Sequence, residues 1–592
     1  MENIFVEFLP PWVETGIQPA FYDKESGSVL QQTARMYARV NMLIRMFNKL
    51  SKNTKEEIET FEHDVNETVD EYIEKFNELY NYVHDYFDNL DVQEEINNKL
   101  DDMVEQGTLQ PLIDAAVIPY VNLNATLPFE TVASMKSADT IVNGSTVMTL
   151  GFYTKGDGGD AIYKVREKEE NEVLDEMTKI AIGDDLVADL IYDDTISVKK
   201  LGAKGDGSNN DTSAITKAIS ICNKVILPNG VYLVNSGFTL KNNLSIIGEK
   251  NTTIKQADGS NITNIFTGSG TQNLLIKNIK IDLNIDNQSY SDRANQGRGV
   301  LVTSSGSNLT FDNFSTSRIY GTFIYLTDST YITTVNCIIG DPDGAYSAYG
   351  IFVVRCQHIL CENCEFSGVR VYGTSLSSYG FYAKDSCLDV LVVKNRFTKM
   401  QCLIDGSKSN GTATYSTSVK IIDNVFTDTP GDTTIRYSKY GLMSHNITRG
   451  SGDFGLSVGN SEFISVDNNV VEGSNTVGIG LRISSQCSVT NNTIINPCQN
   501  FRGLDLVANQ RDGIYVIGNS RRCIITSNNI MDNNSPAKMY SAIAIEDVSG
   551  GTPGADDSFA VICNNSTYGS SSGTAIRAEN TKNIIDNNYI PS

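Results

Sequence analysis

Val390-Leu-Val-Val-Lys-Asn-Arg-Phe397 is the stretch that decides the fold, because its pattern of alternating apolar residues, an asparagine and a further apolar residue returns along the chain. Further copies occupy residues 419–426, 463–470, 487–494 and 523–530. In the middle of this array, Asn424, Asn446, Asn468 and Asn491 recur at about 22 residues, which is one turn of a three-sheet parallel β-helix. The C-terminal two-thirds of the chain is therefore expected to be a parallel β-helix.

The recurring asparagine is expected at the corner of each coil. There it adopts the αL conformation and bonds to the asparagine of the next coil, while the alternating Ile, Val and Phe side chains stack inward. A second set of strands follows glycine, in Gly350-Ile-Phe-Val-Val, Gly380-Phe-Tyr-Ala, Gly455-Leu-Ser-Val and Gly478-Ile-Gly-Leu. Each coil thus carries an asparagine strand and a glycine strand.

Charge and cysteine usage exclude several classes of protein. The formal net charge is −24, with no cluster of Lys and Arg, so no nucleic-acid surface is expected. No apolar stretch reaches the ~20 residues of a membrane span, and the N-terminus lacks the pattern of a signal peptide. The eleven cysteines are expected to be reduced and buried. A zinc half-site at Cys361-Glu-Asn-Cys364, with Cys356 upstream, lacks a second ligand pair, so no cofactor is expected.

A heptad seam precedes the β-rich part of the chain. After a helix start at Ser51 or Thr54, apolar side chains alternate spacings of four and three residues between polar flanks, at Val65, Val69, Tyr72, Phe76, Leu79, Val83, Tyr86 and Leu90. A narrow stripe of this kind is best covered by copies of the same helix, and its large aromatics suit a trimer. A second helical piece is expected from Asp91 to a stop at Gly107.

The segment Val198-Lys-Lys-Leu-Gly-Ala-Lys-Gly-Asp-Gly-Ser-Asn-Asn-Asp-Thr-Ser-Ala-Ile-Thr-Lys-Ala-Ile219, followed by Val225-Ile-Leu-Pro-Asn-Gly-Val-Tyr-Leu-Val234, resembles the entry motif of pectate-lyase-like right-handed β-helix proteins. In that family the motif caps the β-helix with an amphipathic helix. The residues agree, since Asp211 or Thr212 is a helix N-cap and an apolar stripe follows, at Ala214, Ile215, Ala218 and Ile219.

The order of segments is similar to that of tail spike or appendage proteins of short-tailed phages of Gram-positive bacteria. It runs from Pro10-Pro-Trp12 through the coiled helix and the connector, with Gly151-Phe-Tyr-Thr-Lys-Gly-Asp-Gly-Gly159, to the β-helix. The resemblance implies a virion anchor segment at 1–50, a helical trimerisation region at 51–118, a small β-rich connector at 119–197 and a β-helix at 198–592. It also implies contact of the N-terminus with phage tail or portal-collar proteins, and synthesis in the host cytoplasm without a signal peptide.

One candidate site aligns the ends of successive glycine strands. Asp385 and Asp405 are the candidate catalytic acids, with Arg355 and Arg436 as partners for an anionic polymer, all near one lateral line. Coils ~4.8 Å apart bring carboxylates on neighbouring coils to the separations that glycoside hydrolysis needs. The competing interpretation makes both acids turn residues neutralised by the arginines. Tyrosines gather on the same coils, where they suit sugar rings, at Tyr346, Tyr349, Tyr372, Tyr379 and Tyr382.

A rival candidate site lies upstream. Alternation predicts that Asp282, Asn284 and Asp286 share one face of a strand, with Asp292, Arg293 and Arg298 in the following loop. The acids there are alternative catalytic residues, Arg298 is a substrate-binding candidate, and Ca²⁺ is an alternative ligand of the same carboxylates.

Two functions are open for a chain of this kind. The first is a depolymerase, a hydrolase rather than a lyase, that degrades wall teichoic acid or capsular polysaccharide at the bacterial surface. The second is a non-catalytic receptor-binding spike of the same fold. A secreted polysaccharide lyase or hydrolase is disfavoured by the N-terminal segments. Histidine is scarce, which argues against a Ser-His-Asp hydrolase.

Overall fold

The computed structural model describes residues 102–108, 111, 126–292, 295–340, 348–368, 378–407, 414–500, 511–546, 559–572, 574–578 and 583–590. The chain separates into two units, Met1–Val117 and Ile118–Ser592. The predicted anchor segment and heptad seam lie outside the described residues, as do Arg293, Tyr346 and Tyr372. Gly107 is described and has a φ of 66°, as expected of the residue after a helix end. None of the helices within the described ranges has the length and apolar character of a membrane span.

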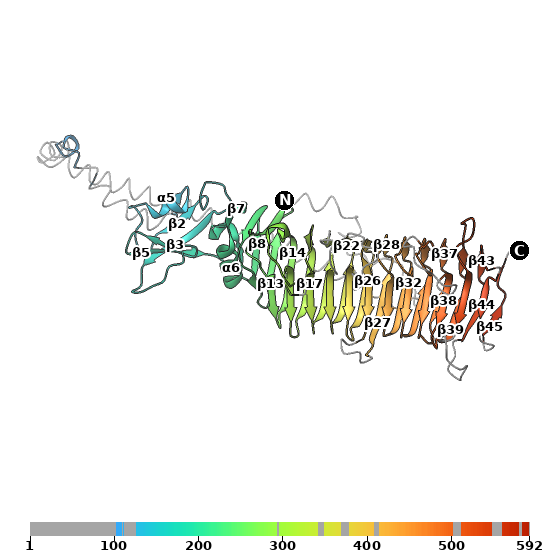
Figure 1. The fold of residues 1–592 in the computed structure, drawn as a ribbon. Coiled ribbons are helices and arrows are strands. Elements are labelled where there is room, and N and C mark those ends of the chain that lie inside the picture. The colour runs from blue at the N-terminus through green and yellow to red at the C-terminus, as the bar shows by residue number, and fades with distance from the viewer. Residues whose placement is uncertain are drawn as a thin grey trace, which may run out of the picture. The chain divides into compact units, whose positions relative to one another are not determined.

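A five-stranded sheet precedes the β-helix (Figure 1). Alternation places Ala161, Tyr163 and Val165 of its central strand inside the core. In the order of the sheet, the strands are β1 (Thr126–Phe129), β2 (Thr146–Thr149), β3 (Ala161–Glu167), β5 (Leu186–Ile191) and β4 (Lys179–Ile182), with the short helix α5 (Val132–Lys136) after β1.

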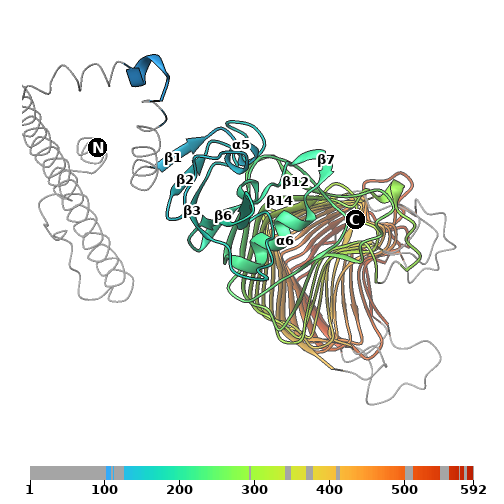
Figure 2. The ribbon, with the colours of Figure 1, turned by 90° about the vertical axis from the view of Figure 1, so that its left-hand side faces the viewer.

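The entry motif forms the cap that its resemblance implied. Helix α6 (Thr212–Ile221) lies across the N-terminal end of the β-helix (Figure 2), and its predicted stripe, from Ala214 to Ile219, is buried. Asp211 is the N-cap residue, but its carboxylate accepts from the backbone N–H groups of Lys204 and Gly205 rather than from the helix. The neighbouring elements are β6 (Thr195–Ser197), η1 (Val198–Leu201), β7 (Asp206–Asn210), β8 (Lys224–Leu227) and β9 (Gly230–Val234).

The rest of the described chain is a parallel β-helix with three strands in a typical coil, which confirms the mainly β prediction. The glycine strands form a 13-stranded sheet. Its strands in order are β10 (Phe238–Thr239), β13 (Asn264–Ser269), β15 (Arg298–Thr303), β17 (Thr322–Thr327), β20 (Tyr349–Val354), β23 (Tyr379–Lys384), β26 (Gln401–Asp405), β29 (Thr433–Arg436), β32 (Leu456–Gly459), β35 (Ile479–Arg482), β38 (Asp512–Ile517), β41 (Ser541–Glu546) and β44 (Ile576–Ala578).

The other two strands of each coil belong to a 27-stranded sheet that bends at the asparagine corner and also includes β6 to β9. One short connection, η2 (Ile285–Asn287), follows β14. The remaining strands are β11 (Ser245–Gly248), β12 (Thr252–Gln256), β14 (Gln272–Asp282), β16 (Ser307–Thr316), β18 (Thr330–Val335), β19 (Ile338–Ile339), β21 (Gln357–Glu362), β22 (Glu365–Ser367), β24 (Leu388–Val393), β25 (Arg396–Thr398), β27 (Ser416–Ile422), β28 (Val425–Thr427), β30 (Ser438–Ser444), β31 (Ile447–Arg449), β33 (Glu462–Asp467), β34 (Val470–Glu472), β36 (Ser488–Thr490), β37 (Thr493–Ile495), β39 (Arg521–Thr526), β40 (Asn529–Met531), β42 (Phe559–Cys563), β43 (Ser566–Tyr568) and β45 (Ile584–Asp586).

The predicted asparagine ladder is present, but in two coils the ladder residue is the one that follows the predicted asparagine. In each ladder residue the backbone N–H and the side-chain Nδ2 donate to Oδ1 of the next one, as from Asn424 to Asn446 at 3.0 Å in both bonds. The ladder consists of Asn395, Asn424, Asn446, Asn469, Asn492, Asn528, Asn565 and Asn588. The prediction was wrong for Asn468 and Asn491, which precede ladder residues.

Two neighbouring residues therefore divide the roles that the sequence assigned to one. The residue before each ladder asparagine takes the positive φ, as at Asp423, His445, Asn468 and Asn491. The ladder residue itself is turned inward and is buried in every coil but the last, where Asn588 is partly exposed. The turn and the ladder bond need different residues, because a side chain that points outward from an αL turn does not reach the buried position of the next coil.

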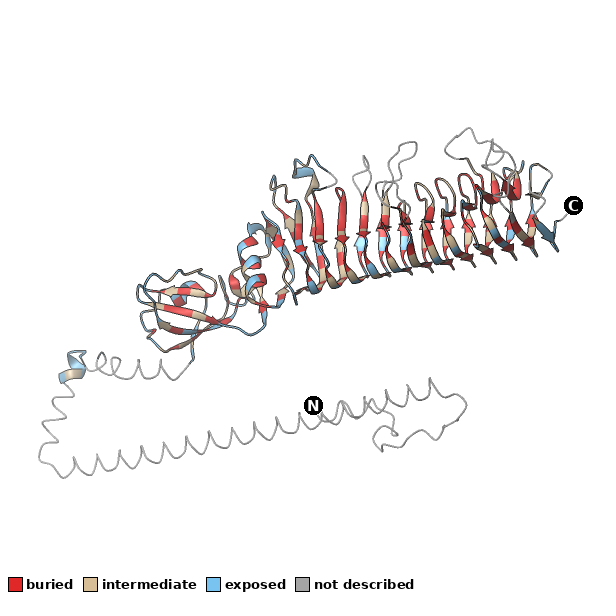
Figure 3. Cartoon of the chain, turned by 90° about the horizontal axis from the view of Figure 1, so that it is seen from below, coloured by how far each residue is buried: buried red, intermediate tan, exposed pale blue. Residues whose placement is uncertain are grey.

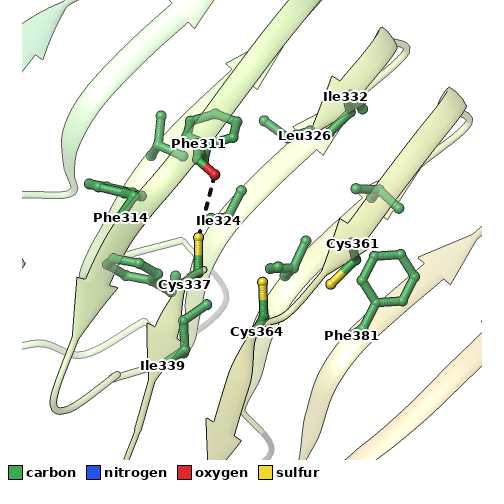
Figure 4. Packing of buried hydrophobic residues seen from close by; sticks show 14 of the residues in the cluster. Phe311, Phe314, Ile324, Leu326, Ile332, Cys337, Ile339, Cys361, Cys364 and Phe381 are labelled. Atoms are coloured by element: carbon green, nitrogen blue, oxygen red, sulfur yellow. Dashed lines mark hydrogen bonds between the residues drawn. The ribbon is translucent and has the colours of Figure 1, made fainter. Parts of the chain in front are cut away.

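Cysteines and aromatic rings continue the stack inside the coils. All eleven cysteines are free thiols, and ten are buried, as expected. Cys337 and Cys364 (Figure 4) hold the ladder position in the coils before Asn395. The Cys364 N–H donates to Asn395 Oδ1 at 2.8 Å. Phe397 stacks between Phe366 and Phe426 with ring centroids 4.7 Å apart on each side. Burial alternates along many of the strands, whereas β26 and β41 are buried at every position (Figure 3).

We predict that Asn469→Ala lowers the free energy of unfolding by about 3 kcal/mol, because it leaves the Asn446 N–H and Nδ2–H groups buried without their acceptor. Asn468→Gly is the matched control, since Asn468 is exposed and glycine accepts its φ of 53°. Chemical denaturation followed by circular dichroism measures both. Equal stability of the two variants would contradict the role of the ladder.

Candidate functional site on the 13-stranded sheet

The outward side chains of the 13-stranded sheet fall on two lines that run from coil to coil. We call this surface the outer face. The first line reads Leu301, Tyr325, Phe352, Tyr382, Leu403, Thr434, Ser457, Gly480, Tyr515, Ala544 and Arg577. The second line, two residues further along each strand, reads Thr327, Val354, Lys384, Asp405, Arg436, Gly459, Arg482, Ile517 and Glu546.

Aromatic rings cover the first coils of the outer face. Phe352 stacks between Tyr325 and Tyr382, with ring centroids 5.2 and 4.8 Å away. Tyr349 and Tyr379 stack beside them at 5.8 Å. Four of these five rings keep part of their surface open to solvent, whereas Tyr382 is 7% exposed. The predicted tyrosine cluster therefore lies outside the coils rather than in their core, as far as it is described.

Tyr382, Asp405 and Arg436 lie on three successive strands and form what we call the central cluster. Arg436 Nη2 donates to Asp405 Oδ2 at 2.8 Å, and the Tyr382 hydroxyl lies 3.4 Å from the same oxygen. The other oxygen, Oδ1, accepts from the backbone and hydroxyl of Ser407 at 3.0 and 2.6 Å. Asp405 is 1% exposed, whereas the Arg436 side chain is 46% exposed. Burial and the nearby charge of Asp405 raise the pKa of Tyr382.

Arg355 and Asp385 form a separate pair in the turns after β20 and β23. Arg355 Nη1 lies 3.1 Å from Asp385 Oδ2, and Arg355 Nε lies 2.6 Å from Asp328 Oδ1. Both Arg355 and Asp385 have positive φ, 54° and 65°. The prediction placed all four residues near one lateral line, and Arg355 and Asp385 each stand one residue beyond the strand position that aligns with Asp405. The Asp385 N–H donates to the Asp405 carbonyl at 2.9 Å, so the two acids remain neighbours along the coils.

The rival site does not form the strand that alternation predicted. Strand β14 ends at Asp282, whose carboxylate accepts from the Asn284 N–H, and Asn284 turns the chain with a φ of 48°. Asp286 is consequently exposed and pairs with Arg318 at 2.6 Å. The side chains expected on one face are thereby separated by a turn.

Arg298 and Asp292, from the same rival site, reach the outer face instead. Arg298 is 5% exposed, and its guanidinium lies over the Tyr325 ring at 5.0 Å. Its Nη2 donates to Asn295 Oδ1 at 3.1 Å, and Asn295 Nδ2 donates to Asp292 Oδ2 at 2.8 Å. Burial lowers the pKa of Arg298. We call the stacked rings of Tyr325, Phe352 and Tyr382, with Tyr349 and Tyr379 beside them, the aromatic row. This row runs from Arg298 to the central cluster.

A second polar cluster lies near the C-terminal end of the outer face, and the sequence reasoning missed it. We call Tyr515, Glu546 and Arg577, again on three successive strands, the C-terminal cluster. The Tyr515 hydroxyl donates to Glu546 Oε2 at 2.7 Å, and Arg577 Nη1 donates to Glu546 Oε1. Arg577 Nη2 also lies 3.4 Å from Asp512 Oδ2. Asp405 was selected because it is an acid at the end of a strand of this sheet. Glu546 stands at the end of Ser541-Ala-Ile-Ala-Ile-Glu546 in the same way, so a search of every coil for such an acid finds it.

Asp512 is the buried acid beneath this cluster. It is 0% exposed, and burial raises its pKa to about 7 although Arg577 opposes the shift. Its Oδ1 accepts from the Ser541 N–H at 3.1 Å. At neutral pH this carboxyl group therefore takes up and releases a proton.

A groove of about 420 Å³ lies on the other sheet, beside the asparagine corner. Polar and charged side chains line it, among them Asn363, Lys394, Arg396 and Asp423. One of its charged side chains is already paired, since Lys394 Nζ lies 3.1 Å from Glu362 Oε1. Aromatic rings are absent from its lining, which contrasts with the outer face.

The chain matches two family models. Residues 195–389 match the rhamnogalacturonase A/epimerase, pectate lyase-like model, and residues 349–530 match the right-handed β-helix region model. The pre-neck appendage protein of Bacillus phage phi29 is 30% identical over 181 residues, which are 29% of this chain and 20% of that protein. Alginate lyase 7 of Azotobacter vinelandii is 37% identical over 110 residues, 15% of this chain and 13% of that protein.

A solved structure, that of the pre-mature bacteriophage phi29 gene product 12, matches with a TM-score of 0.48 and 16% identity, over 64% of this chain and 53% of that chain. The sequence and family-model matches confirm the resemblance to phage appendage proteins with a pectate-lyase-like β-helix. The chain covers a fifth of the length of the phage relative matched in sequence.

We predict that Asp512 makes stability fall as pH rises from about 4 to 7. In this range the folded protein binds the proton of Asp512 more tightly than the unfolded chain does. Deprotonation therefore lowers the free energy of unfolding, by on the order of 4 kcal/mol at ~1.4 kcal/mol per pKa unit. Asp512→Asn removes this dependence. Thermal melts of both proteins between pH 4 and 8 measure it, and parallel curves would show that Asp512 ionises normally.

Proposed function

We propose that the chain is a phage tail spike or appendage protein that binds a surface glycopolymer of its bacterial host, wall teichoic acid or capsular polysaccharide, and degrades it during adsorption. The outer face carries this proposal, because the exposed Arg436 and the partly exposed Arg577, each held by a buried carboxylate, stand on a face that also bears a row of aromatic rings. The match to Bacillus phage appendage proteins supports the virion location and the host surface as the place of action.

Anion binding follows from the way each arginine is held. A guanidinium has five N–H donors, and Asp405 takes one from Arg436 in the central cluster. The remaining donors of this half-exposed group are directed to a phosphate or carboxylate of the polymer. Such local sites are required because the chain as a whole, at −24, repels a polyanion. The aromatic row next to Arg436 supplies flat surfaces for sugar rings.

Cleavage is assigned to the acid pair Asp385 and Asp405, as a hydrolysis of the glycosidic bond. One carboxyl group donates its proton to the leaving oxygen as the carbon–oxygen bond breaks. The other takes a proton from water, whose oxygen bonds to the anomeric carbon. Asp385 is assigned the donor role, because its buried Oδ1 meets no hydrogen-bond donor within the described residues.

A non-catalytic receptor-binding spike is the second candidate function. One observation favours it: both oxygens of Asp405 are engaged by Ser407, Arg436 and Tyr382, and the side chain is almost fully buried. In that case the acids only hold the arginines in place. The chain then binds the polymer without shortening it.

We predict that the purified protein shortens a host glycopolymer, and that Asp405→Asn and Asp385→Asn each slow cleavage by about 10²- to 10⁴-fold with little change in polymer binding. Size-exclusion chromatography of the polymer measures chain length, and Asp389→Asn, at an exposed position of the other sheet, is the control. Full cleavage by the double variant would move the assignment to Asp282, Asp286 and Asp292. Tight binding without cleavage by the wild type would leave the receptor-binding function.

A homotrimer anchored to the tail through residues 1–50 completes the proposal. The heptad seam from Val65 to Leu90 supports it, because a single narrow apolar stripe on a helix is covered by copies of itself. Apolar side chains on the exterior of the 27-stranded sheet support contact between β-helices, among them the exposed Tyr331, Tyr440 and Phe463.

We predict that the full-length protein is a trimer by native mass spectrometry and light scattering. Phe76→Asp combined with Leu79→Asp shifts it toward monomer, since unpaired charges are not tolerated in a shared apolar core. Lys75→Asp is the control, because it adds a comparable charge next to the seam instead of within it. A well-folded monomer at micromolar concentration would overturn the trimer.

A further inference from the structure

The outer face carries the same arrangement twice. In the central cluster, the hydroxyl of Tyr382 and the guanidinium of Arg436 meet the buried Asp405 between them. In the C-terminal cluster, the hydroxyl of Tyr515 and the guanidinium of Arg577 likewise meet Glu546, each at a different carboxylate oxygen. Each set takes its members from three successive strands in the order tyrosine, acid, arginine.

Register places the two clusters on the same lines. Tyr382 and Tyr515 both belong to the first line, and Asp405 and Glu546 both belong to the second. Five strand steps separate each pair of equivalent residues, as from β23 to β38. At ~4.8 Å per step the clusters stand ~24 Å apart along the axis. The clusters differ in two respects: Arg577 lies on the first line and Arg436 on the second, and Arg577 also pairs with Asp512.

Between the clusters, the first line bears small side chains with one aromatic ring beside them, and the second line bears Gly459, the exposed Arg482 and Ile517. Thr434 and Ser457 present hydroxyl groups 2.9 Å apart. Gly480 follows, where a Cβ would come within 2.5 Å of the Phe454 ring, so this ring lies directly on the strand. Phe454 is partly exposed. Hydroxyl groups and an aromatic ring are both suited to contact with sugar rings and polyols.

Burial distinguishes these clusters from ordinary surface ion pairs. Asp405 and Glu546 are 1% and 7% exposed, whereas the side chains of Arg436 and Arg577 remain 46% and 22% exposed. A buried carboxylate that holds a more exposed guanidinium fixes its orientation, which lowers the entropy cost of binding an anion. Surface pairs with both partners exposed, such as Arg396 and Glu365 at 4.0 Å, lack this anchoring.

We infer that the C-terminal cluster is a second anion-binding subsite, and that one extended chain of an anionic glycopolymer lies parallel to the β-helix axis and contacts both clusters at once. This inference rests on the proposed function and specifies its ligand: a polymer with phosphate or carboxylate groups that recur along a chain of at least ~24 Å. Simultaneous contact at two subsites makes binding depend steeply on chain length.

The test measures affinity against chain length by calorimetry with the full-length protein. The probes are glycerol-phosphate oligomers fractionated from Bacillus wall teichoic acid and oligogalacturonates as a carboxylate-bearing alternative. Oligomers longer than the separation of the clusters are expected to bind the wild type at least 10²-fold more tightly than short ones. Arg436→Met and Arg577→Met are each expected to reduce the affinity for long oligomers to near that for short ones.

Arg396→Met is the matched control, since Arg396 lies exposed on the other sheet and its loss leaves both affinities unchanged. Arg577→Lys guards against misfolding, because it keeps a charge for Glu546 but loses the planar donors; it is expected to reduce long-chain affinity several-fold with an unchanged melting temperature. Long-chain affinity that persists in Arg577→Met, or affinity independent of length, would overturn the inference. Failure of every polymer to bind the wild type would instead refute the proposed function.

Discussion

The ladder of buried asparagine side chains is the interaction on which the rest of the structure depends. Each ladder residue has its Oδ1 satisfied by two donors from the preceding coil, and its Nδ2 also donates to a backbone carbonyl, as from Asn446 to Ile421. A coil that slipped by one residue would bury these groups without partners, at a cost of ~1–3 kcal/mol for each. The ladder therefore sets the register of neighbouring coils.

A fixed register determines what the outer face presents. Equivalent positions of successive coils stand in straight lines, so a property repeated in sequence becomes a row on the surface. The aromatic row and the two tyrosine–acid–arginine clusters are such rows, each built from residues some 20 to 40 positions apart in the chain. A long polymer with regularly spaced groups matches a surface of this kind better than a small ligand does.

Local patterns in the sequence were sufficient to predict the fold, but not the contacts between loops and turns. The apolar alternation around Asn424 and the stripe of α6 predicted their structures directly, because both depend on periodicity alone. The pattern did not distinguish Asn468 from Asn469, since adjacent asparagines fit the corner equally well. Asp282 and Asp286 were misplaced because an αL turn at Asn284 ends the strand between them.

The clusters of the outer face required pairing information that a single sequence does not contain. Arg577 reaches Asp512 across 65 positions, over intervening coils of unequal length. The heptad seam lies outside the described residues and stays a prediction. The central claim is that the outer face binds the glycopolymer, and a crystal structure of the protein with a teichoic-acid or capsular oligomer tests it most directly. The account predicts density along the outer face against Arg436; density confined to the groove beside Asn363 and Lys394 would contradict it.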